Sequence, residues 1–150
     1  MSLIDNVGTP ITESLPIAIN LLNKYNLKER VKVIASGKLI TPTEVAWALS
    51  VGADFINNAR GFMFSLGCIQ AMQCNKNTCP TGVTTHKKKL QKGLDANDKS
   101  VRVANYALNM EKEVCIIAHS LGVSDPRKLG REHIKVTSNS TKSLNYQDLF

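Results

Sequence analysis

The residues best suited to chemistry in this chain are three cysteines in one short stretch, Cys68, Cys74 and Cys79. Disulfide bonds explain them poorly, because three is an odd number and the amino-terminal sequence lacks the basic and apolar regions of a secretory signal peptide. We therefore expect a cytoplasmic protein, in a reducing compartment where neighbouring cysteines more often bind metal or carry out redox work. Zinc usually takes four ligands. His86 could supply the fourth, but the usual closely spaced cysteine pairs are absent.

Iron–sulfur ligation fits this stretch better than zinc does. Cysteine thiolates hold such clusters, and a proline directly after the last ligand, as Pro80 is here, recurs in ferredoxin-type binding runs. Three thiolates would suit a three-iron cluster, or a four-iron cluster with one open position. The spacing is not one of the common ferredoxin patterns, however, so three unligated core cysteines are the competing interpretation. We expect the fourth cysteine, Cys115, to be a small buried hydrophobe on a helix.

The composition is that of a globular protein and limits the classes of partner that the chain can bind. Its 150 residues suit one domain, and 43% of them are hydrophobic. The net charge of +7 owes much to the run "HKKKLQKG" from His86 to Gly93. We interpret this run as a solvated face, with an anion-binding patch as the alternative. No aromatic residues interleave with the lysines, which argues against nucleic acid, and no apolar run is long enough to cross a membrane.

Two short strands and a helix are predicted before the cysteines. The β-branched run at 31–34 stops at "ASGK" and predicts a buried strand. In the helix that follows, Thr41 is the expected N-cap, Glu44 completes a capping box and Gly52 ends the helix. "DFINNARG" predicts the second strand, and "FMFSLGCIQAM" turns helical again. This order predicts a βαβ unit with parallel strands.

Further helices are predicted on both sides of this unit. The segment 11–30 has helical apolar spacing at Ile17, Leu21 and Leu22, with Thr12 or Ser14 as its cap. A second helix, at 99–121, follows a cap at Asp95, Asn97 or Asp98 and ends at Gly122. Its expected apolar stripe comprises Val101, Ala104, Leu108, Cys115, Ile116 and Ala118.

The end of the chain is expected to hold one short helix and a polar tail. The sequence "SDPRKLGREHI" predicts the helix, with Ser124 as its cap, and the segment 136–150 is expected to be loosely held. No convincing strand is found outside the βαβ unit. Because two strands cannot form a stable parallel sheet, whose faces and edges need cover, we expect the chain to be part of a larger α/β domain.

The stretch from "IASGK" at Ile34 to "CPTGVTT" at Thr85 resembles the FMN-binding synthase domain of glutamate synthases, and is closest to the archaeal-type branch. The resemblance extends over about Asp5 to Val136, and its most specific part is the cysteine spacing with the ending "NTCPTG". It implies the carboxyl-terminal part of a TIM (β/α)8 barrel. The last βα units would span 5–66, an iron–sulfur cysteine loop 67–85, and carboxyl-terminal helices and tail 86–150.

The resemblance also implies two cofactors, FMN and a [3Fe-4S] cluster held by Cys68, Cys74 and Cys79. In TIM barrels, loops after the seventh and eighth strands often hold phosphate, and "ASGK" and "NNARG" would be those loops. Gly37 would let the backbone approach the phosphate closely, and Lys38 or Arg60 would add charge. The backbone N–H groups that would cradle the phosphate belong to Ser36, Gly37, Lys38, Ala59 and Arg60. No catalytic residue is assigned.

The implied activity is the reduction of 2-iminoglutarate, formed from 2-oxoglutarate and ammonia, to glutamate, with electrons passing between cluster and flavin. Implied partners are a glutamine amidotransferase, an electron donor, and either the remaining amino-terminal barrel portion or a second copy of the chain. The isolated chain is expected to be inactive. One departure is "THKKK", where the family often has Gln and an acidic residue after the threonine. The alternative function is a small non-catalytic module that binds zinc or nucleic acid.

Overall fold

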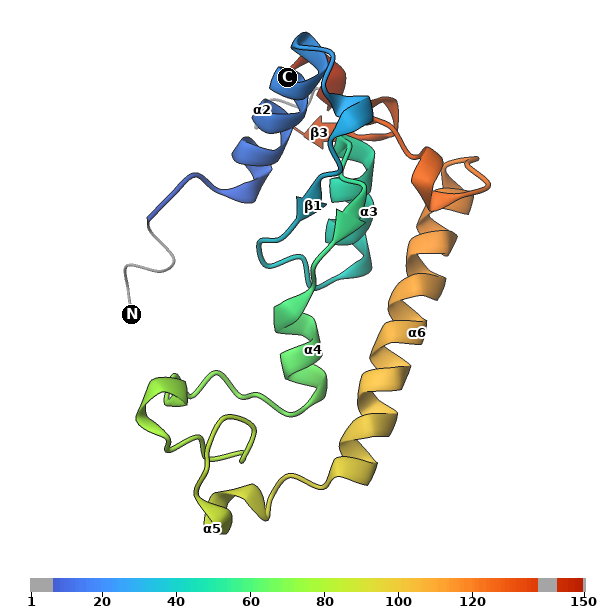
Figure 1. Ribbon diagram of the computed structural model, residues 1–150. Helices are drawn as coiled ribbons and strands as arrows, with labels where there is room; N and C mark the ends of the chain where they lie inside the picture. Colours follow the sequence, from blue (N-terminus) through green and yellow to red (C-terminus); the bar gives the residue numbers. More distant parts are fainter. Residues whose placement is uncertain (1–6, 138–142, 150) are drawn as a thin grey trace.

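The computed structural model describes residues 7–137 and 143–149, and its centre is a small βαβ unit flanked by helices (Figure 1). Strand β1 (Ile34–Ala35) is followed by helix α3 (Pro42–Val51) and strand β2 (Phe55–Ile56). The two strands pair in parallel, with Ile34 opposite Phe55 and Ala35 opposite Ile56. The predicted parallel unit is therefore confirmed.

Helix α3 begins and ends at the residues that the sequence indicates. The Thr41 hydroxyl accepts from the Glu44 amide, and the Glu44 carboxylate accepts from the Thr41 amide at 2.8 Å, which completes the capping box. Gly52 has a φ of +122°, a conformation that residues with a Cβ adopt poorly. These local contacts fix α3 between the two strands.

The prediction that the first strand is buried is wrong on one face. Ile34 is 65% exposed and its partner Phe55 is 49% exposed, whereas Ala35 is 3% exposed. Because opposed residues of paired strands lie on the same face of a sheet, Ile34 and Phe55 form one apolar patch. The Arg127 guanidinium lies over the Phe55 ring, 5.7 Å from its centroid, but about half or more of each of the two side chains stays exposed.

Helix α2 (Ile11–Lys24) is shorter than predicted and turns a different side to the core. Its N-cap is Pro10, without any side-chain cap, so the expected roles of Thr12 and Ser14 are wrong. The buried residues of α2 are Leu15, Pro16 and Ile19, whereas Ile17 and Leu21 are about half exposed. A 3-10 turn, η1 (Lys28–Arg30), connects α2 to β1.

The segment after β2 contains little regular structure. Helix α4 (Ala59–Ser65) ends before Cys68, and the predicted helix over "GCIQAM" is not formed. A 3-10 turn, η2 (Cys74–Lys76), and the short helix α5 (Lys88–Gln91) follow. The cysteines therefore lie on a loop between α4 and α5.

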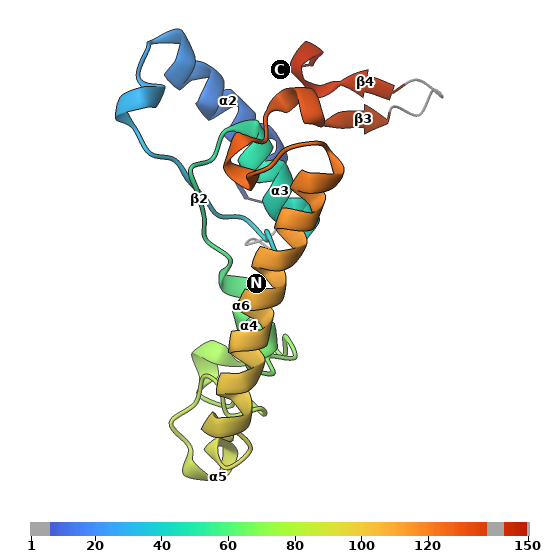
Figure 2. The same cartoon turned by 90° about the vertical axis from the view of Figure 1, so that its right-hand side faces the viewer.

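Helix α6 (Ala96–Ser120) runs along one side of the molecule, from the α5 end to the level of α3 (Figures 1 and 2). Its N-cap is Asp95, whose side chain accepts from the Asn97 amide. Asp95 is one of the three residues predicted for this role. The buried residues are Val114 and Ala118, so the predicted apolar stripe is wrong apart from Ala118. Val101, Leu108 and Ile116 each expose more than half of their surface to solvent. Cys115 is half-buried rather than buried.

The chain after α6 differs from the sequence prediction. Two 3-10 turns, η3 (Pro126–Lys128) and η4 (Arg131–His133), replace the expected helix, and Asp125 rather than Ser124 caps the first of them. The expected loose tail contains strands β3 (Lys135–Thr137) and β4 (Ser143–Asn145), which pair antiparallel, and a last 3-10 turn, η5 (Tyr146–Asp148). Residues 138–142 of the expected tail lie outside the described residues.

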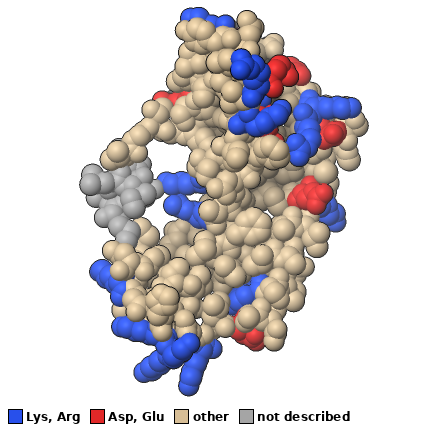
Figure 3. Space-filling view, in the orientation of Figure 1, with Lys and Arg blue, Asp and Glu red and all other residues tan. Residues whose placement is uncertain are grey.

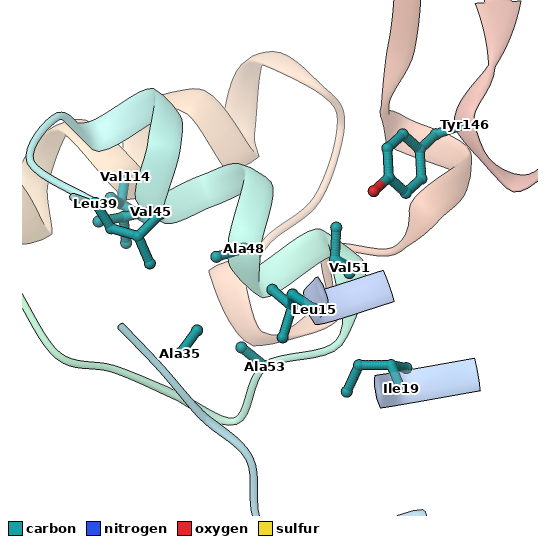
Figure 4. Packing of buried hydrophobic residues seen from close by; sticks show 10 residues of the cluster. All are labelled: Leu15, Ile19, Ala35, Leu39, Val45, Ala48, Val51, Ala53, Val114 and Tyr146. Atoms are coloured by element: carbon teal, nitrogen blue, oxygen red, sulfur yellow. The ribbon is translucent and has the colours of Figure 1, made fainter. Parts of the chain in front are cut away.

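The main core lies between α2, α3, the sheet and α6, and Tyr146 of η5 closes it at one side (Figure 4). A smaller cluster, Ala46, Ala118 and Leu129, packs where α3 meets α6. Among the described residues, no helix combines the length and the apolar character needed to span a bilayer. The residues of the main core are Leu15, Ile19, Ala35, Leu39, Val45, Ala48, Val51, Ala53, Val114 and Tyr146.

Candidate cofactor site

The two loops expected to hold phosphate begin side by side. They follow the carboxyl ends of β1 and β2, and the Asn57 amide donates to the Ala35 carbonyl at 2.8 Å just where the strands end. Parallel strands bring their carboxyl ends to the same edge of a sheet, which is where ligands bind in α/β proteins. The adjacency expected from the sequence is therefore present.

The first of these loops, residues 36–38, packs against the start of α2. A Cβ added at Gly37 would lie 3.0 Å from the Ile11 Cβ, so tight packing against α2 already favours a glycine here. Lys38 has a φ of +60°, a left-handed conformation that costs energy for a residue with a side chain. Gly37 and Lys38 line a recess of about 380 Å³ whose other walls include Ile11 and Trp47. Ser36 is exposed and does not line it.

The second loop leads directly into a cavity shared with the cysteines. The Asn58 side chain caps α4 by accepting from the Gly61 amide at 2.9 Å. Ala59 and Arg60, expected in a loop, instead form the start of α4; both are exposed and line a cavity of about 540 Å³. Its walls are mostly apolar and are formed by Met63, Phe64, Ile69, Met72 and Val83, among others.

All three candidate ligands, Cys68, Cys74 and Cys79, line this same cavity. Cys79 is buried, Cys68 is half-buried and Cys74 is exposed. In the described part of the chain, no three His, Cys, Asp or Glu side chains come close enough together to hold a metal ion. The thiols therefore surround the cavity without converging on one point. His86 is exposed and does not line the cavity.

Cys79 lies where a thiolate is favoured. The Thr81 hydroxyl lies 3.3 Å from Cys79 Sγ, and together with the Thr84 amide and hydroxyl it lowers the pKa of the Cys79 thiol to about 6, against the effect of burial. The buried Thr84 hydroxyl has no partner of full hydrogen-bond geometry among the described residues. A set of thiols with hydroxyl donors in a mostly apolar cavity fits the chemistry of an iron–sulfur cluster.

Asn77 holds the cysteine loop to the lysine run. It has a left-handed φ of 57°, and its side-chain oxygen accepts from the His86 amide at 2.6 Å and from the Thr85 hydroxyl at 3.0 Å. Gln91 of α5 donates to the Thr85 carbonyl. No described acidic residue forms an ion pair with Lys87, Lys88, Lys89 or Lys92, which are exposed beside this loop. In Figure 3, Lys and Arg side chains gather at the α5 end of the molecule.

The structure thus divides the predicted residues into two groups. Ala59 and Arg60 share the cavity with the three cysteines, whereas Gly37 and Lys38 line a separate recess. Sequence reasoning missed Tyr106 of α6, whose hydroxyl donates to the Ile40 carbonyl and accepts from the Asn58 side chain. No local signal marks this residue, because its partners lie far away in the sequence.

The sequence comparisons identify the family. A family model described as a conserved region in glutamate synthase matches residues 1–124. The chain belongs to the glutamate synthase family. It is 44% identical over 147 residues to the glutamate synthase large subunit-like protein YerD of Bacillus subtilis. The aligned residues make up 98% of this chain and 28% of YerD.

Other glutamate synthases match the chain more distantly. The ferredoxin-dependent glutamate synthase of Cyanidium caldarium is 33% identical over 122 residues, which is 81% of this chain and 8% of that protein. The archaeal glutamate synthase (NADPH) of Methanocaldococcus jannaschii is 27% identical over 142 residues, 93% of this chain and 28% of that protein. This member of the glutamate synthase family therefore spans less than a third of the length of these relatives.

Proposed function

We propose that this chain supplies the iron–sulfur ligands and the FMN phosphate loops of a glutamate synthase-type oxidoreductase. The observation that carries the proposal is the common cavity. Cys68, Cys74 and Cys79 line one cavity with Arg60, a cation in the first turn of α4, which follows β2. A cluster bound there would lie next to a group suited to a flavin phosphate. Membership in the glutamate synthase family supports the same function.

In this proposal, the three thiolates hold a [3Fe-4S] cluster, which supplies one-electron transfer when it is bound. Because the thiols surround the cavity without converging, cluster binding requires the loop to draw the exposed Cys74 inward. Thr81 and Thr84 favour the thiolate form of Cys79 and so reduce the competition between protons and iron. The mostly apolar walls would lower the polarity around the bound cluster.

FMN is the second proposed cofactor, and it supplies the reduction of 2-iminoglutarate to glutamate. Arg60 pairs with its phosphate through a charge-assisted hydrogen bond, with the backbone of Ala59 beside it. The loop of Ser36, Gly37 and Lys38 begins beside this group at the end of β1, and it would have to turn out of its own recess to reach the same phosphate. The close start of the two loops, at the Asn57 to Ala35 hydrogen bond, supports this arrangement.

Further parts of the same domain are the proposed cover for the uncovered apolar face of the sheet. Ile34 and Phe55 lie side by side on that face, and the chain spans 28% of the YerD protein. A TIM barrel completed by strands from the remaining length would bury both residues. Where that portion is absent, we propose that a second copy of the chain covers the face.

Two additional partners belong to this proposal, a glutamine amidotransferase as the source of ammonia and an electron donor. The lysines at 87–89 and 92 stand beside the cysteine loop, where they would attract an acidic donor protein to the cluster.

Anaerobic reconstitution of the chain with ferrous iron and sulfide tests the function. The expected product is coloured, contains iron and acid-labile sulfide, and gives the electron paramagnetic resonance signal of an oxidised three-iron cluster. Cys68→Ser, Cys74→Ser and Cys79→Ser should each lose most of the iron. Cys115→Ser is the matched control, because Cys115 lies in the groove between α6 and β2 and not in this cavity.

FMN binding is measured separately, by quenching of flavin fluorescence, and Arg60→Gln should weaken it. A colourless protein that retains zinc in a one-to-one ratio would contradict the proposal and favour a zinc-binding module. Iron retention unchanged in all three cysteine variants would show that iron binds elsewhere.

A further inference from the structure

Tyr106 connects the elements on which the two candidate phosphate loops are built. It lies on α6, and its hydroxyl donates to the Ile40 carbonyl at 2.6 Å. The same hydroxyl accepts from Asn58 Nδ2, also at 2.6 Å. The two partners are 66 and 48 residues away in the sequence, so this one oxygen joins three separate parts of the chain.

The partners of Tyr106 stand next to the proposed FMN loops. Ile40 follows Lys38 by two residues and directly precedes the N-cap of α3. Asn58 directly precedes Ala59 and caps α4. The hydroxyl therefore fixes the end of one loop relative to the start of the other. The Asn57 to Ala35 hydrogen bond holds the start of the first loop against the same end of the second.

The surroundings of the Tyr106 hydroxyl leave little room for movement. A Cβ on Gly61 would overlap this hydroxyl, so the glycine after Arg60 is required for the tyrosine to approach. The Tyr106 ring packs edge-to-face against Phe62, with 5.2 Å between ring centroids. Asn58 uses both ends of its amide, one toward Tyr106 and one toward the Gly61 amide.

From this geometry we infer that Tyr106 is a positioning residue for the FMN phosphate site, because it sets the separation of the loops that carry Lys38 and Arg60. The inference rests on the proposed function. Tyr106 lines neither the cysteine cavity nor the recess at Gly37, so it acts through the backbone of the two loops and not by touching the cofactor.

The test compares FMN with riboflavin, which has the same ring system but no phosphate. Tyr106→Phe removes both hydrogen bonds of the hydroxyl, and we expect it to weaken FMN binding by about five- to tenfold while riboflavin affinity stays within about twofold. Amide hydrogen exchange should rise at Gly61 and at 40–41 in the same variant. Tyr25→Phe is the matched control, since it removes the hydroxyl of a tyrosine that is 62% exposed, ends α2 and lines neither cavity.

The outcomes separate the inference from the function on which it rests. If the unsubstituted chain binds FMN no better than riboflavin, or binds neither, the proposed phosphate site is wrong and the inference falls with it. If the unsubstituted chain prefers FMN and Tyr106→Phe keeps that preference, only the inference is overturned. Equal weakening of both flavins would also overturn it, because that result indicates general destabilisation. Gly61→Ala, which displaces the same hydroxyl, replaces Tyr106→Phe if that variant does not fold.

Discussion

Val33 and Asp54 bind each other in both directions at the start of the parallel sheet. The Val33 amide donates to the Asp54 carboxylate at 2.8 Å, and the Asp54 amide donates to the Val33 carbonyl at 2.9 Å. Lys28 Nζ adds an ion pair to the same carboxylate at 2.8 Å. Asp54 thus aligns the two strands before their first ladder hydrogen bonds and ties both to η1.

The first prediction concerns the stability of the fold in acid. Burial acts to raise the pKa of Asp54, but the hydrogen bonds from Lys28 and Val33 outweigh it and lower the pKa from 3.8 to about 2. A carboxyl group with a lower pKa in the folded state stabilises the fold above its unfolded pKa. The contribution, about 1–2 kcal/mol after allowance for solvent screening, is lost as the pH falls from about 4 to about 2.

Asp54→Asn should therefore lower the free energy of unfolding at pH 7 by about 1–2 kcal/mol, and the difference should shrink toward pH 2. Urea denaturation at a series of pH values measures this. Asp148→Asn, at an exposed position, should have little effect at any pH. A deficit in Asp54→Asn that is constant over the whole pH range would show that the charge of Asp54 is irrelevant.

The second prediction concerns Asn77. Asn77→Gly keeps the left-handed backbone available but removes the hydrogen bonds to Thr85 and His86. Faster amide exchange at His86 and lower iron retention after reconstitution are expected. Asn75→Gly makes the same change at an exposed neighbour without these bonds and should behave like the unsubstituted chain. Equal iron retention in both variants would show that the hydrogen bonds of Asn77 are not needed for cluster binding.

The third prediction concerns self-association through the uncovered face of the sheet. Ile34→Thr keeps a β-branched residue in the strand but makes the patch with Phe55 less apolar. We expect weaker self-association in analytical ultracentrifugation. Leu108→Thr is the control, because Leu108 is equally exposed (64%) but lies on α6. If Leu108→Thr reduces association and Ile34→Thr does not, the contact lies on the helix.

The fourth prediction concerns the lysine run. The double variant Lys88→Glu and Lys89→Glu should slow reduction of the reconstituted chain by an acidic iron–sulfur donor protein, and the difference should vanish at high salt. Lys112→Glu with Lys128→Glu applies the same charge change away from the cysteine loop and should have a smaller effect. Equal slowing by both double variants would indicate a response to net charge alone.

Local signals predicted the parts of the fold that local contacts determine. The capping box of Thr41 and Glu44, the left-handed Gly52 and the cap at Asp95 are formed by residues within four positions of each other. The burial of particular faces was not predictable in this way. Ile34 has the residue type of a buried strand, yet nothing in the described part of the chain covers it.

The β3–β4 hairpin and the contacts between loops were not predicted from the sequence, because they too depend on contacts with other segments. Strands β3 and β4 are three residues each and mostly polar, so pairing with each other, and not their composition, defines them. For the candidate site, the cysteine loop and both strand ends were predicted from the sequence. Their division between two cavities, and the part taken by Tyr106, depend on contacts between distant segments that have no periodic pattern.

Substitutions where α3 crosses α6 should affect the hydrogen bonds of Tyr106, although they lie far from it. Ala46 and Ala118, 4% and 0% exposed, let the two helices approach closely, so the angle at which α6 crosses α3 depends on the side-chain volume at this contact. Tyr106 lies twelve residues before Ala118 on the same helix, about 18 Å along its axis. A tilt of about 5° at the alanine contact would move the tyrosine hydroxyl by about 1.5 Å, enough to break a hydrogen bond of 2.6 Å. Small volume changes at Ala118 would thus be magnified at Asn58 and Ile40, although neither residue touches it.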